Sequence, residues 1–208
     1  MGFGEAYALQ RELVESRKKG LIADQLLLLE HAHVITLGRN AEERNLLASE
    51  EVLSRNGIEL HETDRGGDVT YHGPGQLVAY PIFDLREWKR DVVAYVRGLE
   101  QVMIAALAGF GIEARQQEGC TGVWVGEAKV AAIGVHLSRW VTSHGLALNV
   151  DTDLNYFRYI VPCGLTKPVT SMKELGCGAS MGEVREAVVE QFAKVFAFQT
   201  EIVQETMA

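Results

Sequence analysis

A glycine-rich stretch in the first half of the chain limits how the rest can fold. Residues 65–76 read RGGDVTYHGPGQ, and apolar segments run into and out of them. Glycine permits positive φ angles and lets a ligand approach the backbone, so the clusters at 66–67 and 73–75 predict two bends around a short β-prone piece. An ordinary hairpin would also fit, but the polar residues gathered here favour a binding loop, because function concentrates on loops held by a scaffold.

This loop does not have the motif of a nucleotide-binding site. A P-loop would end in Gly-Lys-Ser or Gly-Lys-Thr, and a dinucleotide-binding fold would carry G-x-G-x-x-G between a strand and a helix. Residues 65–76 contain neither pattern. The loop therefore predicts a ligand other than a nucleotide.

The bulk composition is that of an ordinary globular protein. The chain has 208 residues, 47% of them hydrophobic and 23% charged, which suits one domain with a sizeable core. A net charge of −8 argues against nucleic-acid binding. We expect no apolar stretch long enough to cross a bilayer, no signal peptide and no membrane partner, and hence a cytoplasmic location. His31 and His33 lack further ligands nearby, so we expect no metal.

Apolar residues at helical and alternating spacings predict an α+β protein. The pattern predicts helices at 3–19, 49–56, 91–109 and 181–196, and strands at 24–30, 33–37, 58–62, 77–83, 112–116, 122–125, 129–137, 142–150 and 198–204. The first two strands are expected to form a hairpin, with 26–29 buried on both faces. Together they predict a single domain over residues 1–208, with a mixed, largely antiparallel sheet and flanking helices.

Three cysteines are candidates for a reactive thiol. Their spacings match no zinc pattern, and a cytosolic chain keeps cysteines reduced. Cys163 lies between Pro162 and Gly164, so it sits on a rigid bend that can hold its sulfur toward a cleft. Cys177 lies between two glycines and is a rival on local sequence, whereas Cys120 precedes a strand and is expected to be packed. Local sequence alone does not choose between a chemical and a buried role for Cys163.

Lys129 opens an otherwise apolar strand, VAAIGV at 130–135. A lysine at a strand end commonly extends its ammonium to solvent. If it instead points into a cleft with Cys163, its charge favours the thiolate. A free thiol with a pKa near 8.5 is about one tenth ionised at pH 7.5, and lowering that pKa by one unit, worth about 1.4 kcal/mol, makes it about half ionised.

Several stretches of the chain together resemble a known family. RGGDVTYHGPGQ at 65–76, AKVAAIGVHLSRWVTSHGLALNV at 128–150 and IVPCGLT at 160–166 are similar to the lipoyl(octanoyl) transferases, the lipoate–protein ligase B family. GEAYALQRELVESR at 4–17 also resembles the opening helix of that family. The resemblance runs from about residue 7 to residue 163, and the separate motifs occur in the family's order.

This resemblance implies a fold like the catalytic domain of biotin and lipoate protein ligases. It makes Cys163 the acyl-carrying nucleophile and Lys129 the residue that lowers its pKa. It also implies substrate contacts in the glycine-rich loop and on two strands. These contacts are Arg65, Gly66, Gly67, Asp68, Val69, Thr70, Tyr71, His72, Ala132, Ile133, Gly134, Gly145, Leu146 and Ala147.

The reaction implied is transfer of an octanoyl group from acyl carrier protein to a lysine of a lipoyl domain. The acceptors would be the lipoyl domains of 2-oxoacid dehydrogenase complexes and the glycine cleavage H protein, and the enzyme would act as a monomer without ATP or a metal. Two other interpretations remain open. An ATP-dependent lipoate ligase on the same fold would need no cysteine, and a non-catalytic binding module would form no acyl adduct.

The acidity of the chain raises a question about docking, since carrier and lipoyl domains are also acidic. Either basic residues near the cleft form a local patch, or electrostatic attraction does not drive docking. The residues that could form such a patch are Arg65, Arg139, Arg158, Lys167 and Lys173.

Overall fold

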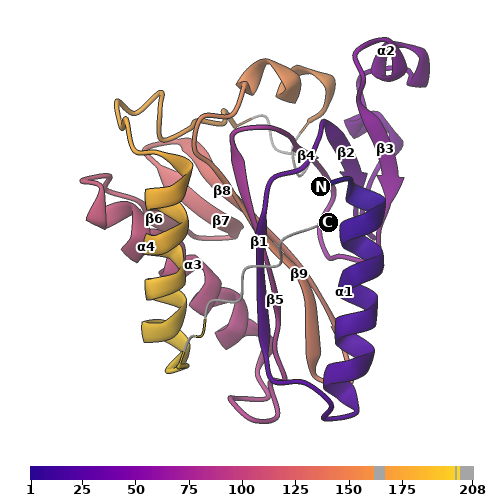
Figure 1. Cartoon of the computed structure of the whole chain (residues 1–208). Coiled ribbons are helices and arrows are strands. Elements are labelled where there is room, and N and C mark those ends of the chain that lie inside the picture. Colours follow the sequence, from indigo (N-terminus) through magenta and orange to yellow (C-terminus); the bar gives the residue numbers. More distant parts are fainter. Residues whose placement is uncertain (162–166, 200, 202–208) are drawn as a thin grey trace.

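A six-stranded antiparallel sheet forms the centre of the molecule (Figure 1). The computed structural model describes residues 1–161, 167–199 and 201. The strand order is β1-β5-β9-β8-β7-β6. In that order the strands span Gln25–Leu29, Gln76–Ile82, Val141–Asn149, Ala128–Ser138, Cys120–Val125 and Arg115–Gln117. A tight turn joins β7 to β8, because Val125 pairs with Ala128.

A second sheet of three strands lies beside the first, in the order β3-β2-β4. Its strands span Glu59–Glu62, Val34–Leu37 and Val69–His72, and β2 pairs in parallel with β3 and antiparallel with β4. Between β4 and β5 the chain passes from the small sheet to the large one at residues 73–75. Gly75 has a φ of 77°, and a methyl group there would lie 2.4 Å from the Asp151 carbonyl oxygen, so this crossing needs glycine.

Helices cover both faces of the large sheet. α3 (Val92–Gly109) and α4 (Met181–Phe196) pack together on one face, and α1 (Phe3–Lys18) packs against β5 and β9 on the other (Figure 1). The alternation of side chains along β5 explains this division: Leu77 and Ala79 join the α3–α4 core, whereas Val78 and Tyr80 pack with Ala6 of α1. The shorter helices are α2 (Glu50–Arg55) and the 3₁₀ segments η1 (Glu43–Asn45) and η2 (Leu154–Tyr159).

The predicted α+β class, with a largely antiparallel sheet and flanking helices, is confirmed. A capping box starts the helix at 181–196, since the Ser180 side chain accepts from the Glu183 backbone N–H and the Glu183 carboxylate accepts from the Ser180 backbone N–H. The helix predicted at 91–109 is confirmed as α3, with Asp91 as its N-cap.

Several details of the predicted fold were wrong. The strands at 24–30 and 33–37 do not form a hairpin, because β1 pairs with β5 in the large sheet and β2 belongs to the small one. β1 is an edge strand whose residues are half-buried, so it is not buried on both faces. Residues 198, 199 and 201 are not in a strand, and the rest of the expected last strand lies outside the described residues.

The expectation that no segment could span a membrane was also wrong in part. Within the described ranges, α3 is long and apolar enough to do so by length and composition alone. A core helix of a soluble protein passes the same test. The apolar side of α3 packs on α4 and the large sheet, with residues such as Leu99, Val102 and Met103 fully buried.

Candidate functional site

A β-bulge turns Lys129 toward the face of the sheet that α1 covers. β7 and β8 change register here, because Val123 pairs with Ala131 while Trp124 pairs with Lys129. The extra residue, Val130, and Ala131 both face the α3–α4 core. Lys129 therefore points to the opposite face instead of continuing the alternation set by Ala131. Bulges commonly re-aim a side chain in this way beside active sites.

The surroundings of Lys129 hold its long side chain in place. Lys129 is 7% exposed, and its Nζ lies 4.9 Å from the centre of the Trp124 ring, in cation–π contact. The Nζ of Lys167 lies 5.2 Å from the same ring. This burial favours the alternative in which Lys129 points into a cleft over the one in which it extends its ammonium to solvent.

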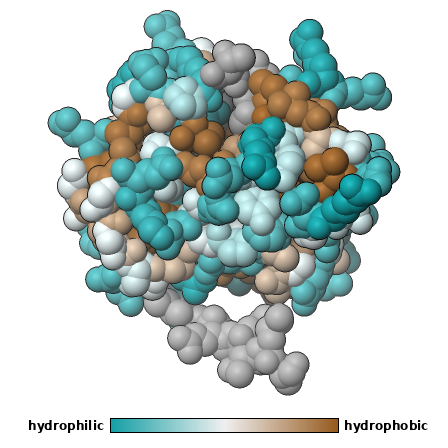
Figure 2. All heavy atoms as spheres, turned by 90° about the horizontal axis from the view of Figure 1, so that it is seen from above, coloured by the Kyte–Doolittle hydropathy of each residue, from teal (hydrophilic) through white to brown (hydrophobic). Residues whose placement is uncertain are grey.

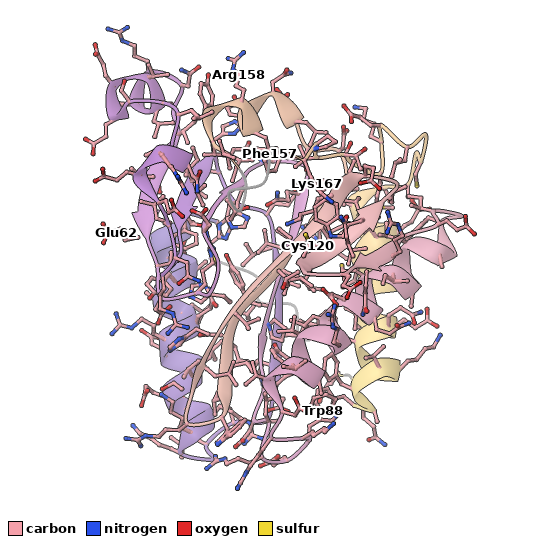
Figure 3. The ribbon with its side chains drawn as sticks, turned by 180° about the vertical axis from the view of Figure 1, so that it is seen from behind. Glu62, Trp88, Cys120, Phe157, Arg158 and Lys167 are labelled. Atoms are coloured by element: carbon pink, nitrogen blue, oxygen red, sulfur yellow. The ribbon has the colours of Figure 1, made fainter. Side chains whose placement is uncertain are left out.

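The described residues on either side of 162–166 are held by backbone hydrogen bonds. The Val161 N–H donates to the Asn45 carbonyl at 2.8 Å. On the other side, Lys129 N–H donates to the Pro168 carbonyl, and Thr170 N–H donates to the Lys129 carbonyl, each at 2.9 Å. Figure 3 shows Phe157 and Lys167 at the same end of the molecule, with Trp88 at the other. The predicted nucleophile Cys163 lies outside the described residues.

The other two cysteines are free and half-buried. Cys177 packs against the α3–α4 core, and its backbone N–H donates to the Met172 carbonyl. Cys120 lies at the start of β7. Neither lines the pockets beside Lys129.

Two adjoining pockets lie on the Lys129 side of the sheet. Lys129 lines the first together with Phe157 and Val169. Thr70, Ala132 and Ala147 line both. The second continues along β8 and β9 to Phe3, Tyr80 and His144.

The structure brings most of the predicted substrate contacts together around the second pocket. These are Arg65, Gly67, Thr70, His72, Ala132, Ile133, Gly134, Gly145, Leu146 and Ala147. Their role in binding a substrate stays a prediction, but three segments that are distant in the sequence now share one pocket.

The remaining predicted contacts do not line either pocket. Val69 and Tyr71 are buried in the core of the small sheet, where the Tyr71 hydroxyl bonds to His33 Nδ1 at 2.7 Å. Burial raises the pKa of Tyr71 above its usual value. Asp68 accepts from Asn45 Nδ2, the Glu42 N–H and its neighbour's N–H, which ties the loop at 38–46 to β4. Their positions favour support of the loop over contact with a ligand.

Gly66 and Arg65 fix the glycine-rich loop over β8. The Gly66 N–H donates to the Val135 carbonyl at 2.9 Å, and a methyl group on Gly134 would lie 3.0 Å from the Gly66 carbonyl oxygen. The Arg65 guanidinium donates to the Thr36 carbonyl and hydroxyl and to the Gly66 carbonyl. Arg65 thus joins the loop to β2 while its side chain borders the pocket.

A buried chain of hydrogen bonds connects this loop to the Lys129 segment. His72 Nδ1 bonds to Gln76 Oε1 at 2.7 Å, and Gln76 Nε2 donates to Asn149 Oδ1 at 2.9 Å. Asn149 Nδ2 then donates to the carbonyl of Thr170, whose N–H bonds to Lys129. Because Gln76 uses its amide N–H groups elsewhere, its oxygen accepts, and His72 carries its proton on Nδ1. Burial lowers the pKa of His72 to about 3, so the ring is neutral.

The five basic residues considered for a docking patch do not all share one exposed surface. Arg65 is buried, and Arg139 lies in the turn between β8 and β9, at the opposite end of β8 from Lys129. Lys173 bonds to Asp151 at 2.6 Å, and Lys167 lies 3.8 Å from Glu127. Figure 2 shows hydrophobic and hydrophilic residues interspersed on the face that is seen from above.

Residues 3–193 match the model of the lipoyl protein ligase A/B catalytic domain. The chain belongs to this family. Within it, an octanoyltransferase of Solibacter usitatus is 64% identical over 95% of this chain and 90% of its own length. One of Koribacter versatilis is 56% identical over 93% of this chain and 80% of its own. The predicted family is confirmed.

Solved structures of ligases have the same fold at low sequence identity. A lipoate-protein ligase A bound with ATP aligns with a TM-score of 0.75 and 18% identity, over 95% of this chain and 85% of its own. The bi-partite lipoate protein ligase of Thermoplasma acidophilum gives 0.74 and 19%, over 95% and 83%. A biotin protein ligase of Aquifex aeolicus gives 0.52 and 17%, over 79% and 70%. The predicted likeness to ligase catalytic domains is confirmed at the level of the fold.

Several residues of this family member's site were missed by the sequence analysis. Asn149 belongs to the hydrogen-bond network described above, Trp124 contacts the Lys129 side chain, and Phe157 lines the first pocket. A polar residue ending the apolar strand LALN was a signal for Asn149. Trp124 gave no such signal, because an aromatic residue in a strand is ordinarily core.

Proposed function

We propose that this chain transfers an octanoyl group from acyl carrier protein to a lysine of a lipoyl domain, through a thioester on Cys163. This transfer would be the first step of endogenous protein lipoylation. The acceptors we propose are the lipoyl domains of 2-oxoacid dehydrogenase complexes and the glycine cleavage H protein. Octanoyl transfer itself rests on relatives named octanoyltransferase, 64% and 56% identical over nearly the whole chain.

The observation that carries the proposal is the burial of Lys129 in the first of two adjoining pockets. From Lys129 the two pockets follow β8 as far as Gly134, which is four regular strand steps and one bulge residue, or about 13–16 Å. An extended eight-carbon chain spans about 9 Å, since each C–C bond of roughly 1.5 Å advances it by about 1.25 Å. The small side chains of Ala132 and Ala147 leave room for it. Burying such a chain contributes roughly 5 kcal/mol at about 0.8 kcal/mol per methylene.

The first half-reaction moves the acyl group onto the enzyme. The Cys163 thiolate attacks the thioester carbonyl of the carrier, a new carbon–sulfur bond forms, and the carrier thiolate leaves. The positive charge of Lys129 favours the thiolate before attack, and its proton goes to the departing carrier thiolate. Backbone N–H groups of the glycine-rich loop are candidates to stabilise the oxyanion.

The second half-reaction moves the acyl group onto the acceptor. The amine of the target lysine attacks the acyl-cysteine, the amide bond forms, and the Cys163 thiolate is released. Lys129 takes up the proton that the amine loses, which restores the starting state. Thioester exchange is close to balanced and amide formation from a thioester is downhill, so the cycle needs no ATP and no metal.

A cytoplasmic, monomeric enzyme is part of this proposal. The two cysteines within the described part of the chain, Cys120 and Cys177, are free. Free thiols are the usual state of cysteines in a reducing compartment.

The experiment is to mix the purified protein with octanoyl-acyl carrier protein and an unmodified lipoyl domain, without nucleotide, and to measure the acceptor mass. We expect a gain of one octanoyl group on one lysine. A reaction that proceeds only with ATP would overturn the proposal in favour of a ligase. No modification under either condition would favour a binding module.

A further inference from the structure

A fully buried carboxyl group on α3 supports the bulge that re-aims Lys129. Glu100 is 0% exposed. Its Oε1 accepts from the backbone N–H of Gly122 in β7 at 3.1 Å, and its Oε2 pairs with Arg97 at 2.7 Å. A buried backbone N–H at an irregular point of a strand needs a partner. Glu100 supplies that partner from the helix behind the sheet.

Gly122 in turn lies directly against the Lys129 side chain. A methyl group on Gly122 would lie 3.3 Å from Lys129 Cε, 3.4 Å from Lys129 Cδ and 2.7 Å from the Ala131 carbonyl oxygen. Gly122 also has a φ of 125°, which side chains rarely allow. The backbone of Gly122 and the Trp124 ring therefore border the Lys129 side chain, which leaves it little freedom.

We propose that Glu100 is a positioning residue that fixes the Lys129 ammonium in the first pocket through the Gly122 backbone. Its consequence for turnover rests on the function proposed above, but the positioning itself does not. A displacement of about 1 Å in a catalytic group can lower a rate about 10²-fold. Loss of the Glu100–Gly122 hydrogen bond is therefore expected to act on kcat, because Glu100 and Gly122 lie outside the substrate pocket.

Three substitutions separate positioning from general stability. Glu100→Leu removes the acceptor and keeps a side chain of similar size. Glu100→Gln keeps an oxygen that accepts from Gly122 and is the conservative rescue. Gly122→Ala leaves the Glu100 acceptor in place but puts a methyl group against Lys129. The matched control is Arg97→Gln, which removes the half-exposed partner of Glu100 and leaves the bond to Gly122 intact.

Two readouts are measured on each folded variant. The first is kcat and KM for octanoyl transfer. The second is the rate at which an amine-reactive acylating reagent labels Lys129, followed by peptide mass spectrometry with the exposed Lys194 as internal standard. The labelling does not depend on enzyme activity, so it tests the positioning even if the proposed transfer fails.

We expect Glu100→Leu and Gly122→Ala to lower kcat about 10- to 100-fold with KM within about twofold, and to raise Lys129 labelling severalfold. Glu100→Gln and Arg97→Gln should stay near the parent in both readouts. If Glu100→Leu does not fold, Glu100→Asp, whose shorter side chain withdraws the acceptor from the Gly122 N–H, takes its place with the same expected results. Folded Glu100→Leu or Gly122→Ala protein with parental labelling and parental kcat would overturn the proposal.

Discussion

Lowering the pH from 7.5 to 5 is expected to destabilise this protein through two buried histidines. Burial lowers the pKa of His72 to about 3 and that of His31 to about 4. His31 Nε2 bonds to the Tyr80 hydroxyl at 2.7 Å, and the two imidazole rings lie 5.8 Å apart, so a charge on one disfavours a charge on the other. Both rings are neutral in the folded protein throughout this pH range.

The size of the effect follows from proton linkage. Unfolded histidines have a pKa near 6.5, so between pH 6.5 and the folded values the unfolded state binds more protons, and stability falls as the pH falls. At pH 5 each histidine loses about 2 kcal/mol, which is 1.5 pH units at about 1.36 kcal/mol each. The two together lose about 4 kcal/mol, a large part of the roughly 5–15 kcal/mol of a typical domain.

One carboxyl group adds to this trend, but only at lower pH. The hydrogen bond from His144 holds the pKa of Asp64 well below its usual value. Its contribution to stability is fully present above the unfolded pKa of 3.8 and is lost only as the pH falls below that. Asp64 therefore does not contribute to the change of the unfolding free energy between pH 7.5 and 5, which comes from the histidines.

Urea unfolding at half-unit steps from pH 7.5 to 5 measures this slope. Below pH 6 His31 and His72 should contribute about two protons to this slope, about 2.7 kcal/mol per pH unit, and the buried His144, whose pKa is also lowered by burial, adds to it. His72→Asn, whose amide can still donate to Gln76, should reduce the slope by about one proton. His61→Asn, at a partly exposed site, is the control and should keep the parental slope. A flat stability profile, or a parental slope in His72→Asn, would refute the reasoning.

Three further predictions concern the pocket. Lys129→Ala should stay folded and lose about 10²–10⁴-fold in transfer rate, and Lys129→Arg should not restore it, because arginine does not release its proton near neutral pH; steady-state kinetics and circular dichroism check both. Ala132→Phe should block the passage between the two pockets and raise KM for octanoyl thioesters more than for acetyl thioesters, whereas equal effects would place the acyl chain elsewhere. Lys167→Glu with Lys173→Glu should change KM for the carrier less than about threefold at 150 mM salt, because both lysines lie near acidic partners. A larger rise in KM would mean that these lysines contribute to binding of the carrier.

Much of the fold was accessible from the sequence because the signals were local. The helix at 181–196 has apolar residues on one side and a capping box formed by Ser180 and Glu183, and each acts within a single turn. The strands 129–137 and 142–150 likewise carry apolar runs, and they were found within one or two residues as β8 and β9. Local pattern was sufficient where one element decides its own structure.

Pairing between strands could not be read in the same way. The segments at 24–30 and 33–37 are close in sequence and both β-prone, yet β1 pairs with β5, and β2 pairs with β3 and β4, all of them 25 or more residues away along the chain. The bulge at Val130 could not be predicted either. Nothing in the sequence VAAIGV shows that β8 has one residue more than β7 where the two strands pair. The direction of the Lys129 side chain depends on that bulge. From the sequence, its position in the pocket could therefore be expected only through the family resemblance.

The acyl-enzyme is the central claim, and one mass measurement tests it most directly. Protein incubated with octanoyl-acyl carrier protein in the absence of acceptor should gain one octanoyl group on the peptide that contains Cys163. Hydroxylamine should remove it, and addition of a lipoyl domain should discharge it. Cys163→Ala should gain nothing, while Cys120→Ala and Cys177→Ala should gain the group as the parent does. An adduct on another residue, or full transfer by Cys163→Ala, would contradict the account.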